Sequence, residues 1–290
     1  MKTIHQILLD AVNILKQNNV QTPRLDAEVI LAHLLGWDRI DLITRSREVL
    51  DQDLEQEYYH FIQERAAGKP VQYITGQQEF MGLNFKVTPD VLIPRPDTEI
   101  LVETAIKEAG TMEPPLTIVD VGTGSGAISI SLAHYIKGAH IHSIDISPKA
   151  LGVAMENARL HSLEHRVTFY QGDLFDPIDD LLRSRVDLLV SNPPYIPTHQ
   201  IPNLQREVRY YEPTLALDGG EDGLDYYRRI IQEGEKFLSP RGCLILEIGH
   251  DQGARVAELL KCKKRLKDVI IVEDLAGIGR VVRARVKERD

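Results

Sequence analysis

The 290-residue sequence predicts an α/β fold with a doubly wound, seven-stranded sheet and a small N-terminal helical bundle. After Pro114 and Pro115, apolar runs rich in β-branched residues alternate with helical patterns, the order expected of parallel strands covered by helices. The last two strand patterns are joined by only a few residues around Gly277. So short a link permits an antiparallel hairpin but no parallel crossover. We therefore expect five parallel strands followed by a C-terminal antiparallel hairpin.

Residues 1–75 are expected to form the helical bundle as a domain of their own. Apolar residues recur there at three- and four-residue steps, which predicts helices over about 4–15, 23–35 and 51–67. Gly36 follows the second helix, where the absence of a Cβ makes a helix end inexpensive.

Residues 76–96 are expected to form an ordered connector. A loose alternation over residues 79–88 is typical of a hairpin, and the three prolines that follow it prevent a regular helix. A new helix is expected to begin near Asp97 or Thr98, because their short oxygen-bearing side chains can accept hydrogen bonds from the free amides of a first turn.

Residues 97–290 are expected to hold the sheet in a second domain. The parallel strands are predicted at residues 117–121, 140–145, 166–171, 186–191 and 243–248, and the hairpin strands at 268–274 and 279–285. Helices between and after the parallel strands are predicted at residues 127–136, 148–160, 224–238 and 252–260.

The composition restricts the possible function classes. Cys243 and Cys262 are too few and too far apart for a disulfide framework or a thiolate metal site, which fits a reducing compartment. No apolar stretch approaches the roughly 20 residues of a membrane span. A net charge of −9 argues against a large basic surface for nucleic acid. We therefore expect a cytoplasmic protein without a metal site that acts on a protein or a small molecule. A monomer is a further expectation, which the composition does not address.

A glycine-rich segment, Asp120-Val-Gly122-Thr-Gly124-Ser-Gly126, lies where the first strand should turn into its helix. Glycines there allow a tight turn and a close approach of the backbone to a ligand. Asp145 ends the second strand, where a carboxylate can accept hydrogen bonds from both hydroxyls of a ribose. Asp173, after the third strand, could accept from the amine of an adenine, or it could simply cap a loop. These residues predict nucleoside binding and suit a nicotinamide cofactor equally well.

The tetrapeptide Asn192-Pro193-Pro194-Tyr195 follows the fourth predicted strand, and ligands of such sheets bind just beyond the carboxyl ends of the strands. Proline lacks an N–H, so the backbone there offers carbonyl acceptors without a competing donor. The side-chain oxygen of Asn192 adds an acceptor, and Tyr195 offers an aromatic face on which a flat group could stack. Two prolines could also simply terminate a strand.

Methylation of a planar NH₂ group explains these residue types best. An amide nitrogen is a poor nucleophile because its lone pair is delocalised into the carbonyl. Acceptors that hold both N–H bonds raise the electron density on nitrogen, and fixed carbonyl dipoles stabilise the positive charge that develops there. The site residues thus predict transfer of a methyl group from S-adenosyl-L-methionine.

Several motifs resemble those of the release factor glutamine N5-methyltransferases, and the resemblance covers nearly the whole chain. It is carried by the glycine segment and Asn192–Tyr195, by Pro23–Glu28 and Leu92–Glu99, and by Glu212-Pro213, Ala216-Leu217, Gly219-Gly220 and Asp222-Gly-Leu224. The resemblance implies a class I methyltransferase sheet, an N-terminal helical domain that recognises the substrate, and a release factor as the protein partner.

The resemblance also implies roles for individual residues. Asn192 and Pro193 would hold the glutamine amide of the release factor's Gly-Gly-Gln loop, with Pro194 beside them and Tyr195 against the amide plane. S-adenosyl-L-methionine would be bound by Asp120, Gly122, Thr123, Gly124, Ser125, Gly126, Asp145, Asp173, Leu174 and Asn192. Some relatives look aromatic at the position of Leu174, so stacking of that residue on adenine stays open.

Other interpretations stay open at this stage. An adenine-N6 methyltransferase on DNA or RNA could use the same tetrapeptide after base flipping, and a related enzyme methylates a ribosomal protein glutamine. A non-catalytic cofactor-binding module would usually lack the tetrapeptide or a glycine, whereas both are intact here. Arg95 could meet an acidic partner in the connector, and Tyr210-Tyr211 could line a peptide groove or pack internally. His140 and His142 lack a third ligand at a suitable spacing and are expected to be exposed to solvent.

Overall fold

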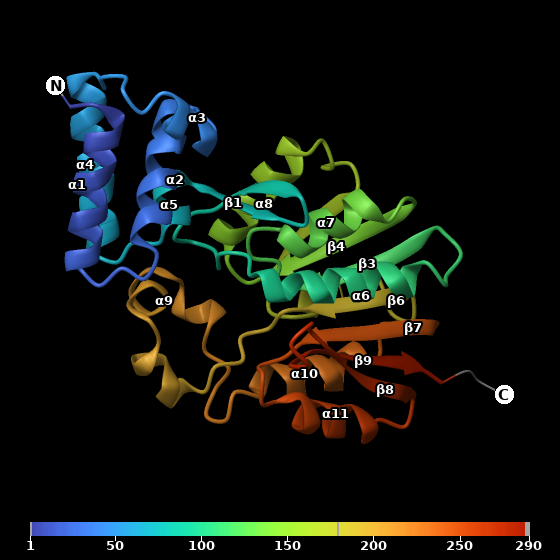
Figure 1. Ribbon diagram of the computed structural model, residues 1–290. Coiled ribbons are helices and arrows are strands. Elements are labelled where there is room, and N and C mark those ends of the chain that lie inside the picture. The colour runs from blue at the N-terminus through green and yellow to red at the C-terminus, as the bar shows by residue number, and fades with distance from the viewer. Residues whose placement is uncertain (1, 179, 288–290) are drawn as a thin grey trace. The chain divides into compact units, whose positions relative to one another are not determined.

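The structure is a computed structural model that describes residues 2–178 and 180–287. The chain divides into two compact units (Figure 1). The first comprises the residues up to Gln77 together with Gln205–Tyr211, and the second comprises Gln78–Leu204 and the residues from Glu212 onward. The predicted boundary after residue 75 lies close to this division, but the separate piece 205–211 was not anticipated.

The first unit is helical. Its helices are α1 (Ile4–Gln17), α2 (Pro23–Leu35), α3 (Arg39–Thr44), α4 (Gln52–Ala66), α5 (Val71–Thr75) and α9 (Arg206–Tyr211). The three helices predicted from periodicity are present, and α2 ends at Gly36, which adopts the left-handed conformation with a φ of 64°. Helices α3 and α5 have six and five residues, too few to display a helical period in the sequence.

A buried ion pair gives a structural role to Asp26, which lies in the segment Pro23–Glu28. Asp26 in α2 and Arg65 in α4 are each about 5% exposed or less, and Arg65 Nε donates to Asp26 Oδ2 at 2.6 Å. The Nη2 atom of Arg65 also donates to Glu207 Oε1 in α9 at 2.5 Å. A buried charge is tolerated only when it is paired, so these contacts bind α9 to the helices of the first unit.

The second unit contains the seven-stranded sheet, whose strand order is β5-β4-β3-β6-β7-β9-β8. Its strands are β3 (Leu116–Val121), β4 (Ala139–Asp145), β5 (Val167–Gln171), β6 (Val186–Ser191), β7 (Leu238–Glu247), β8 (Leu266–Glu273) and β9 (Gly279–Val286). Strands β3 to β7 pair in parallel, whereas β9 is antiparallel to both β7 and β8. The predicted fold class, with five parallel strands and a C-terminal antiparallel hairpin, is confirmed.

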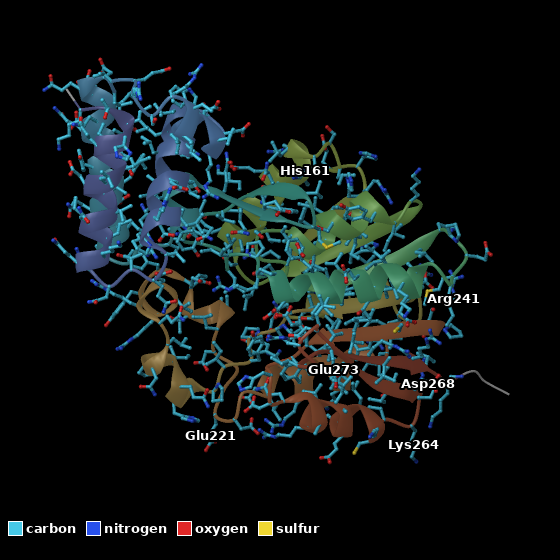
Figure 2. The ribbon with its side chains drawn as sticks, in the orientation of Figure 1. His161, Glu221, Arg241, Lys264, Asp268 and Glu273 are labelled. Carbon is cyan, nitrogen blue, oxygen red and sulfur yellow. The ribbon has the colours of Figure 1, made fainter. Side chains whose placement is uncertain are left out.

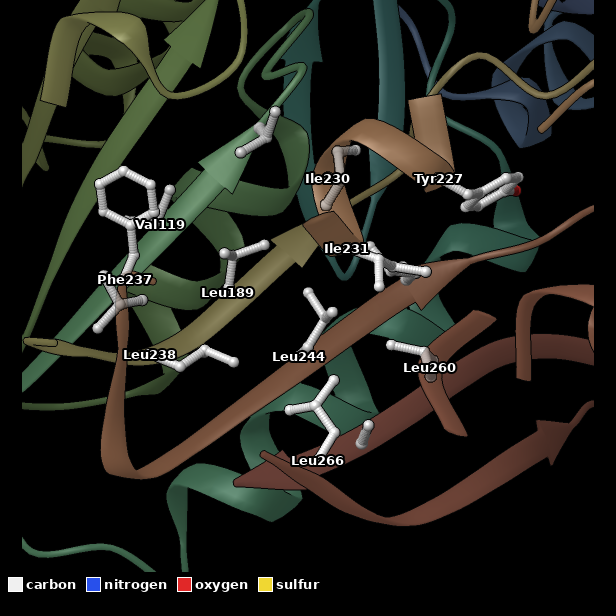
Figure 3. Close-up of a cluster of buried hydrophobic side chains, with 14 of the residues drawn as sticks. Val119, Leu189, Tyr227, Ile230, Ile231, Phe237, Leu238, Leu244, Leu260 and Leu266 are labelled. Atoms are coloured by element: carbon white, nitrogen blue, oxygen red, sulfur yellow. The ribbon is translucent and has the colours of Figure 1, made fainter. Parts of the chain in front are cut away.

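Helices cover both faces of the sheet, with α10 (Asp225–Gly234) and α11 (Gly253–Lys261) on one face and α6 (Glu99–Ala109), α7 (Ala127–Tyr135) and α8 (Pro148–Leu160) on the other (Figure 1). Successive strand residues therefore enter two different cores. Figure 3 shows the core beneath α10 and α11, where Val119, Leu189 and Leu244 of three strands meet Ile230 and Ile231. The neighbouring strand residues Ile118, Leu188 and Ile245 lie in the other core.

Two element boundaries differ from the prediction by four or five residues. Strand β7 begins at Leu238, five residues before the predicted residue 243, because a register shift lets Leu238 pair with Val186 ahead of the main ladder. Helix α10 accordingly ends at Gly234 and not at residue 238. Sequence periodicity could not anticipate either boundary, because the extra strand residues depend on pairing with β6.

The connector forms the predicted hairpin, with strands β1 (Gln77–Phe80) and β2 (Leu83–Lys86). A short 3-10 helix, η1 (Pro96–Thr98), then leads into α6. Thr98 makes no side-chain capping bond, so the reason predicted for a helix start there is wrong. None of the helices in the described part of the chain combines the length and apolarity that a membrane span requires.

Candidate functional site

A cavity lies at the carboxyl ends of β3, β4 and β6, where the strand order reverses on either side of β3. Crevices at this position bind ligands in open α/β sheets. The empty space in the cavity and at its open mouth is about 890 Å³. Its lining includes the site residues Gly122, Gly124, Asp145, Asp173, Leu174, Asn192, Pro193 and Pro194.

The glycine segment forms a tight turn whose backbone amides are largely occupied. The N–H groups of Gly122 and Thr123 donate to the Ile144 carbonyl at 2.9 and 3.1 Å. Gly126 has a φ of 82°, and a Cβ there would lie 2.9 Å from Ile130 Cδ1 and 3.1 Å from the Cβ of Ala154. Gly126, Thr123 and Ser125 do not line the cavity, and Thr123 and Ser125 are buried. These three residues therefore shape the turn from behind the cavity.

Asp145 joins the glycine segment to the end of β4. Its Oδ2 accepts a hydrogen bond from the Gly124 N–H at 2.8 Å, and its Oδ1 accepts from the Ser147 N–H at 2.9 Å. Burial raises its pKa, and the backbone donors oppose that shift. A carboxylate has about four lone-pair sites, so each oxygen can still accept from a ribose hydroxyl. In the structure Asp145 thus orders the loop as well as lining the cavity.

Asp120 is fully buried at the end of β3 and does not line the cavity. Its Oδ2 accepts from the Ser129 hydroxyl at 2.5 Å and from the Thr123 hydroxyl at 3.2 Å, whereas its Oδ1 has no hydrogen-bond partner among the described residues. Burial raises the pKa of Asp120 to about 6. Asp120 therefore stabilises the glycine turn through its hydrogen bonds with Thr123 and Ser129.

The segment after β5 brings Asp173 and Leu174 to the cavity wall. Asp173 Oδ2 accepts from Arg229 Nη2 at 2.7 Å, and both side chains are about two-fifths exposed. Leu174 is 7% exposed and has a φ of 49°. A leucine at this wall supplies an apolar surface in place of an aromatic ring.

The tetrapeptide follows β6, as predicted. Asn192, Pro193 and Pro194 line the cavity, and Asn192 Nδ2 donates to the Thr98 hydroxyl oxygen at 3.2 Å. Tyr195 does not line the cavity, because its side chain packs against the core beneath α10 and α11, and burial raises its pKa to about 12. The Tyr195 carbonyl accepts from Gln252 Nε2 at 2.9 Å.

The glycines that follow the tetrapeptide in the chain pack against its backbone. Gly219 N donates to the carbonyl of Ile196, the residue after Tyr195, at 2.8 Å, and Ile196 N donates to the Leu217 carbonyl at 3.0 Å. A Cβ on Gly219 would lie 2.7 Å from Tyr195 Cα and 2.9 Å from the Pro194 carbonyl oxygen. Gly219 is therefore required by the close approach of two backbones, and it fixes where the Pro194 carbonyl lies.

The connector contributes residues that sequence reasoning did not assign to the site. The cavity is also lined by Asp90, Val91 and Leu92 of the connector, by Ile146, Ser147 and Ala150 after β4, and by Pro213, Leu215, Ala216, Tyr226 and Ile230. Arg95 pairs with Glu212, whose side chain is 1% exposed, so the acidic partner considered for Arg95 is present. Only the resemblance motifs around Leu92 and Ala216 signalled these segments.

His140 and His142 are not solvent-exposed, which corrects the prediction. Both are half-buried: His140 Nε2 lies 2.8 Å from Thr168 Oγ1, and His142 Nδ1 lies 3.0 Å from the Tyr170 hydroxyl oxygen. Burial and the neighbouring His140 lower the pKa of His142 to about 4. Both histidines therefore pack against the edge strand β5.

Tyr210 is 64% exposed, whereas the Tyr211 hydroxyl donates to the Ala67 carbonyl within the first unit at 3.3 Å. Of the two tyrosines, only Tyr211 makes an internal hydrogen bond of this kind, and neither lines the cavity.

Two family models match this chain. Residues 6–76 match the PrmC N-terminal domain, and residues 113–268 match a methyltransferase domain. The first match corresponds to the helices of the first unit up to α5. The second contains the glycine turn, Asp145 and the tetrapeptide.

Proteins of known function are similar over the full length. The chain is 47% identical to a release factor glutamine methyltransferase of Moorella thermoacetica over 99% of both chains. It is 40% identical to one of Geobacter sulfurreducens, over 98% of this chain and 97% of the relative. Among solved structures, the hMettl16 catalytic domain in complex with MAT2A 3'UTR hairpin 6 has a TM-score of 0.56 at 18% identity, covering 79% of this chain and 82% of that one. The last similarity concerns the class I methyltransferase fold alone.

Proposed function

The chain belongs to the release factor glutamine methyltransferase family, and we propose that it methylates the side-chain nitrogen of a glutamine in a peptide chain release factor. The methyl donor in this proposal is S-adenosyl-L-methionine, and the acceptor is the glutamine of a Gly-Gly-Gln loop. We further propose that the helical first unit recognises the release factor.

One observation carries the proposal: Asn192 and Pro193 line the same cavity as Gly122, Gly124 and Asp145. A nucleoside held by the glycine turn and Asp145 would place its reactive end near β3 and β6, where the tetrapeptide lies. The donors and acceptors in the cavity suit the cofactor, since Asp145 has free lone pairs for ribose hydroxyls and Leu174 offers an apolar wall. S-adenosyl-L-methionine, when bound, supplies an activated methyl group on a sulfonium.

The tetrapeptide acts on the amide nitrogen of the substrate. The Asn192 Oδ1 and the Pro193 carbonyl oxygen accept the two N–H bonds of the flat NH₂ group, which fixes its plane and raises the electron density on nitrogen. As nitrogen gains its new bond, positive charge develops there, so the same two oxygens stabilise the transition state more than the ground state. The surplus proton can leave after methylation, so no strong base is required in the cavity.

Tyr195 keeps a proposed role against the plane of the amide. Its ring packs against the core in this structure, so stacking on the substrate requires the ring to reach the cavity. The Tyr195 backbone meanwhile contributes to positioning, because Gln252 and Gly219 hold it in place.

The predicted cytoplasmic location and monomeric state stay predictions.

Tritium transfer tests this function directly. Labelled S-adenosyl-L-methionine is incubated with the protein and a recombinant release factor, and label is expected in the release factor only when its Gly-Gly-Gln glutamine is present. A matched release factor with that glutamine changed to alanine should take up no label. Labelling of DNA or RNA in place of the protein, or of a ribosomal protein alone, would refute the proposal.

A further inference from the structure

A buried carboxylate lies directly behind the tetrapeptide. Glu247 is the last residue of β7, and its neighbour Leu246 pairs in register with Ser191, the residue before Asn192. The adjacent ends of two parallel strands therefore place Glu247 beside Asn192. Glu247 is 3% exposed, and it is not among the cavity-lining residues, so it does not reach a substrate directly.

The side chains of Thr98 and Asn192 lie near the Glu247 carboxyl, and both lower its pKa. Thr98 is 4% exposed and makes no capping bond, although it stands at the start of α6. An ionised carboxylate can only accept, so it draws the Thr98 hydroxyl proton toward itself. The Thr98 oxygen then presents its lone pairs to Asn192 Nδ2, which donates to it at 3.2 Å.

The orientation of the Asn192 amide decides whether the site can work. An asparagine amide carries an acceptor on one side and two donors on the other, in nearly the same shape, so its partners determine which side faces the substrate. A substrate NH₂ group can only donate here, so the Asn192 side chain must present Oδ1 to it. Thr98 and Glu247 both present acceptors behind Asn192, and these fit only the Nδ2 side.

We infer that Glu247 is a positioning residue, which, with Thr98, holds Asn192 Nδ2 away from the cavity and so directs Oδ1 toward the substrate amide. This inference rests on the proposed function, because it assigns Asn192 Oδ1 to an N–H of the substrate. It adds to the tetrapeptide a residue from a different strand, 55 positions later in the chain than Asn192.

The surroundings of Glu247 are poor for a purely structural carboxylate. Its Oε2 has no hydrogen-bond partner among the described residues. Its pKa is raised to about 7, mainly by burial; Asp97 also raises it, whereas Thr98, Arg280 and Asn192 lower it. The pKa of Glu247 in the folded protein lies above its usual value of 4.5, so ionisation of this group destabilises the folded state. The destabilisation grows as the pH rises from about 4.5 to 7. A glutamine at this position should therefore leave the fold no less stable at pH 8.

Two variants and one matched control test the inference. Glu247→Gln introduces an NH₂ that can donate to Asn192 Oδ1, which permits the reversed amide. Thr98→Val keeps the shape and removes the acceptor of Asn192 Nδ2. The control is Asp187→Asn, the same chemical change on a buried carboxylate at the other end of β6, where Asp187 accepts from Thr117 N, the Ser239 hydroxyl and Arg241 Nε. Figure 2 labels Arg241, which lies near the start of β7, at the right of the view.

For each protein, kcat and KM for a release factor, the Kd for S-adenosyl-L-methionine and the Tm at pH 8 are measured. Glu247→Gln and Thr98→Val are expected to lower kcat by about tenfold or more, because misdirected contacts at a reacting group act mainly on the transition state. The Tm of Glu247→Gln should equal or exceed that of the wild type, and the Kd should be unchanged. Asp187→Asn should show the reverse, with a lower Tm and the wild-type kcat.

The outcomes separate the two claims. An active wild type whose kcat survives both Glu247→Gln and Thr98→Val would overturn the inference and leave the proposed function intact. A kcat that falls only in step with the Tm would also overturn it, because Glu247 would then serve the fold. If Glu247→Gln fails to fold, Glu247 has a structural role and the inference is again overturned. A wild type that labels no release factor would refute the proposed function, and the inference with it.

Discussion

Asp145→Asn should weaken cofactor binding while leaving the fold and the chemical step intact. The two oxygens of Asp145 accept from Gly124 N at 2.8 Å and from Ser147 N at 2.9 Å, and they retain lone pairs for a ribose. The substitution turns one oxygen into an NH₂, so one charge-assisted bond that Asp145 would accept from a ribose hydroxyl is lost. Such a bond contributes about 1.5–3 kcal/mol, which corresponds to a roughly 10–150-fold higher Kd.

Isothermal titration with S-adenosyl-L-methionine measures this Kd, and kcat is measured at saturating cofactor. Asp222→Asn is the matched control, because Asp222 is a loop carboxylate that accepts from Leu224 N and two arginines but does not line the cavity. The control should bind like the wild type. An unchanged Kd in Asp145→Asn would refute the assignment of Asp145 to the cofactor, and an equal loss in both variants would show that the effect is not specific to the site.

Three further predictions concern the site backbone, the first unit and pH. Gly219→Ala should lower kcat without unfolding the protein, because its Cβ would lie 2.7 Å from the Tyr195 Cα and push the tetrapeptide aside; unchanged kinetics would contradict this. Asp26→Asn should destabilise the protein by about 3–5 kcal/mol in urea unfolding, since it leaves Arg65 buried with a poorer partner; a loss near zero would contradict that reading. Between pH 4.5 and 8, the wild type should lose on the order of 3 kcal/mol of stability relative to Glu247→Gln, because the raised pKa of about 7 means that ionisation of Glu247 destabilises the folded state. A difference in stability that does not change with pH would contradict this prediction.

Much of the cavity was predictable because strand ends in a parallel sheet converge. Each of Gly122, Asp145 and Asn192 follows a strand pattern that is legible in the sequence, and parallel pairing brings the carboxyl ends of these strands to one edge. The apolar runs that predict the strands also predict where the strands end, so the residues just beyond those ends were assigned to one site together.

The residues behind the tetrapeptide were not predictable in the same way. Glu247 ends an apolar strand pattern and looks like an ordinary strand end, and only the register of β7 beside β6 reveals that it lies next to Asn192. Thr98 was assigned to a helix cap, because sequence pattern cannot show that its hydroxyl bonds to a residue 94 positions away. The membership of α9 in the first unit likewise depends on Arg65 and Glu207, which are 142 positions apart.

The central claim is that Asn192 Oδ1 grips the amide of a release factor glutamine during methyl transfer. Asn192→Ala removes that oxygen and should lower kcat on a release factor by about 10²–10³-fold, as loss of one preorganised charge-stabilising contact does elsewhere. Turnover of Asn192→Ala at the wild-type rate would contradict the account.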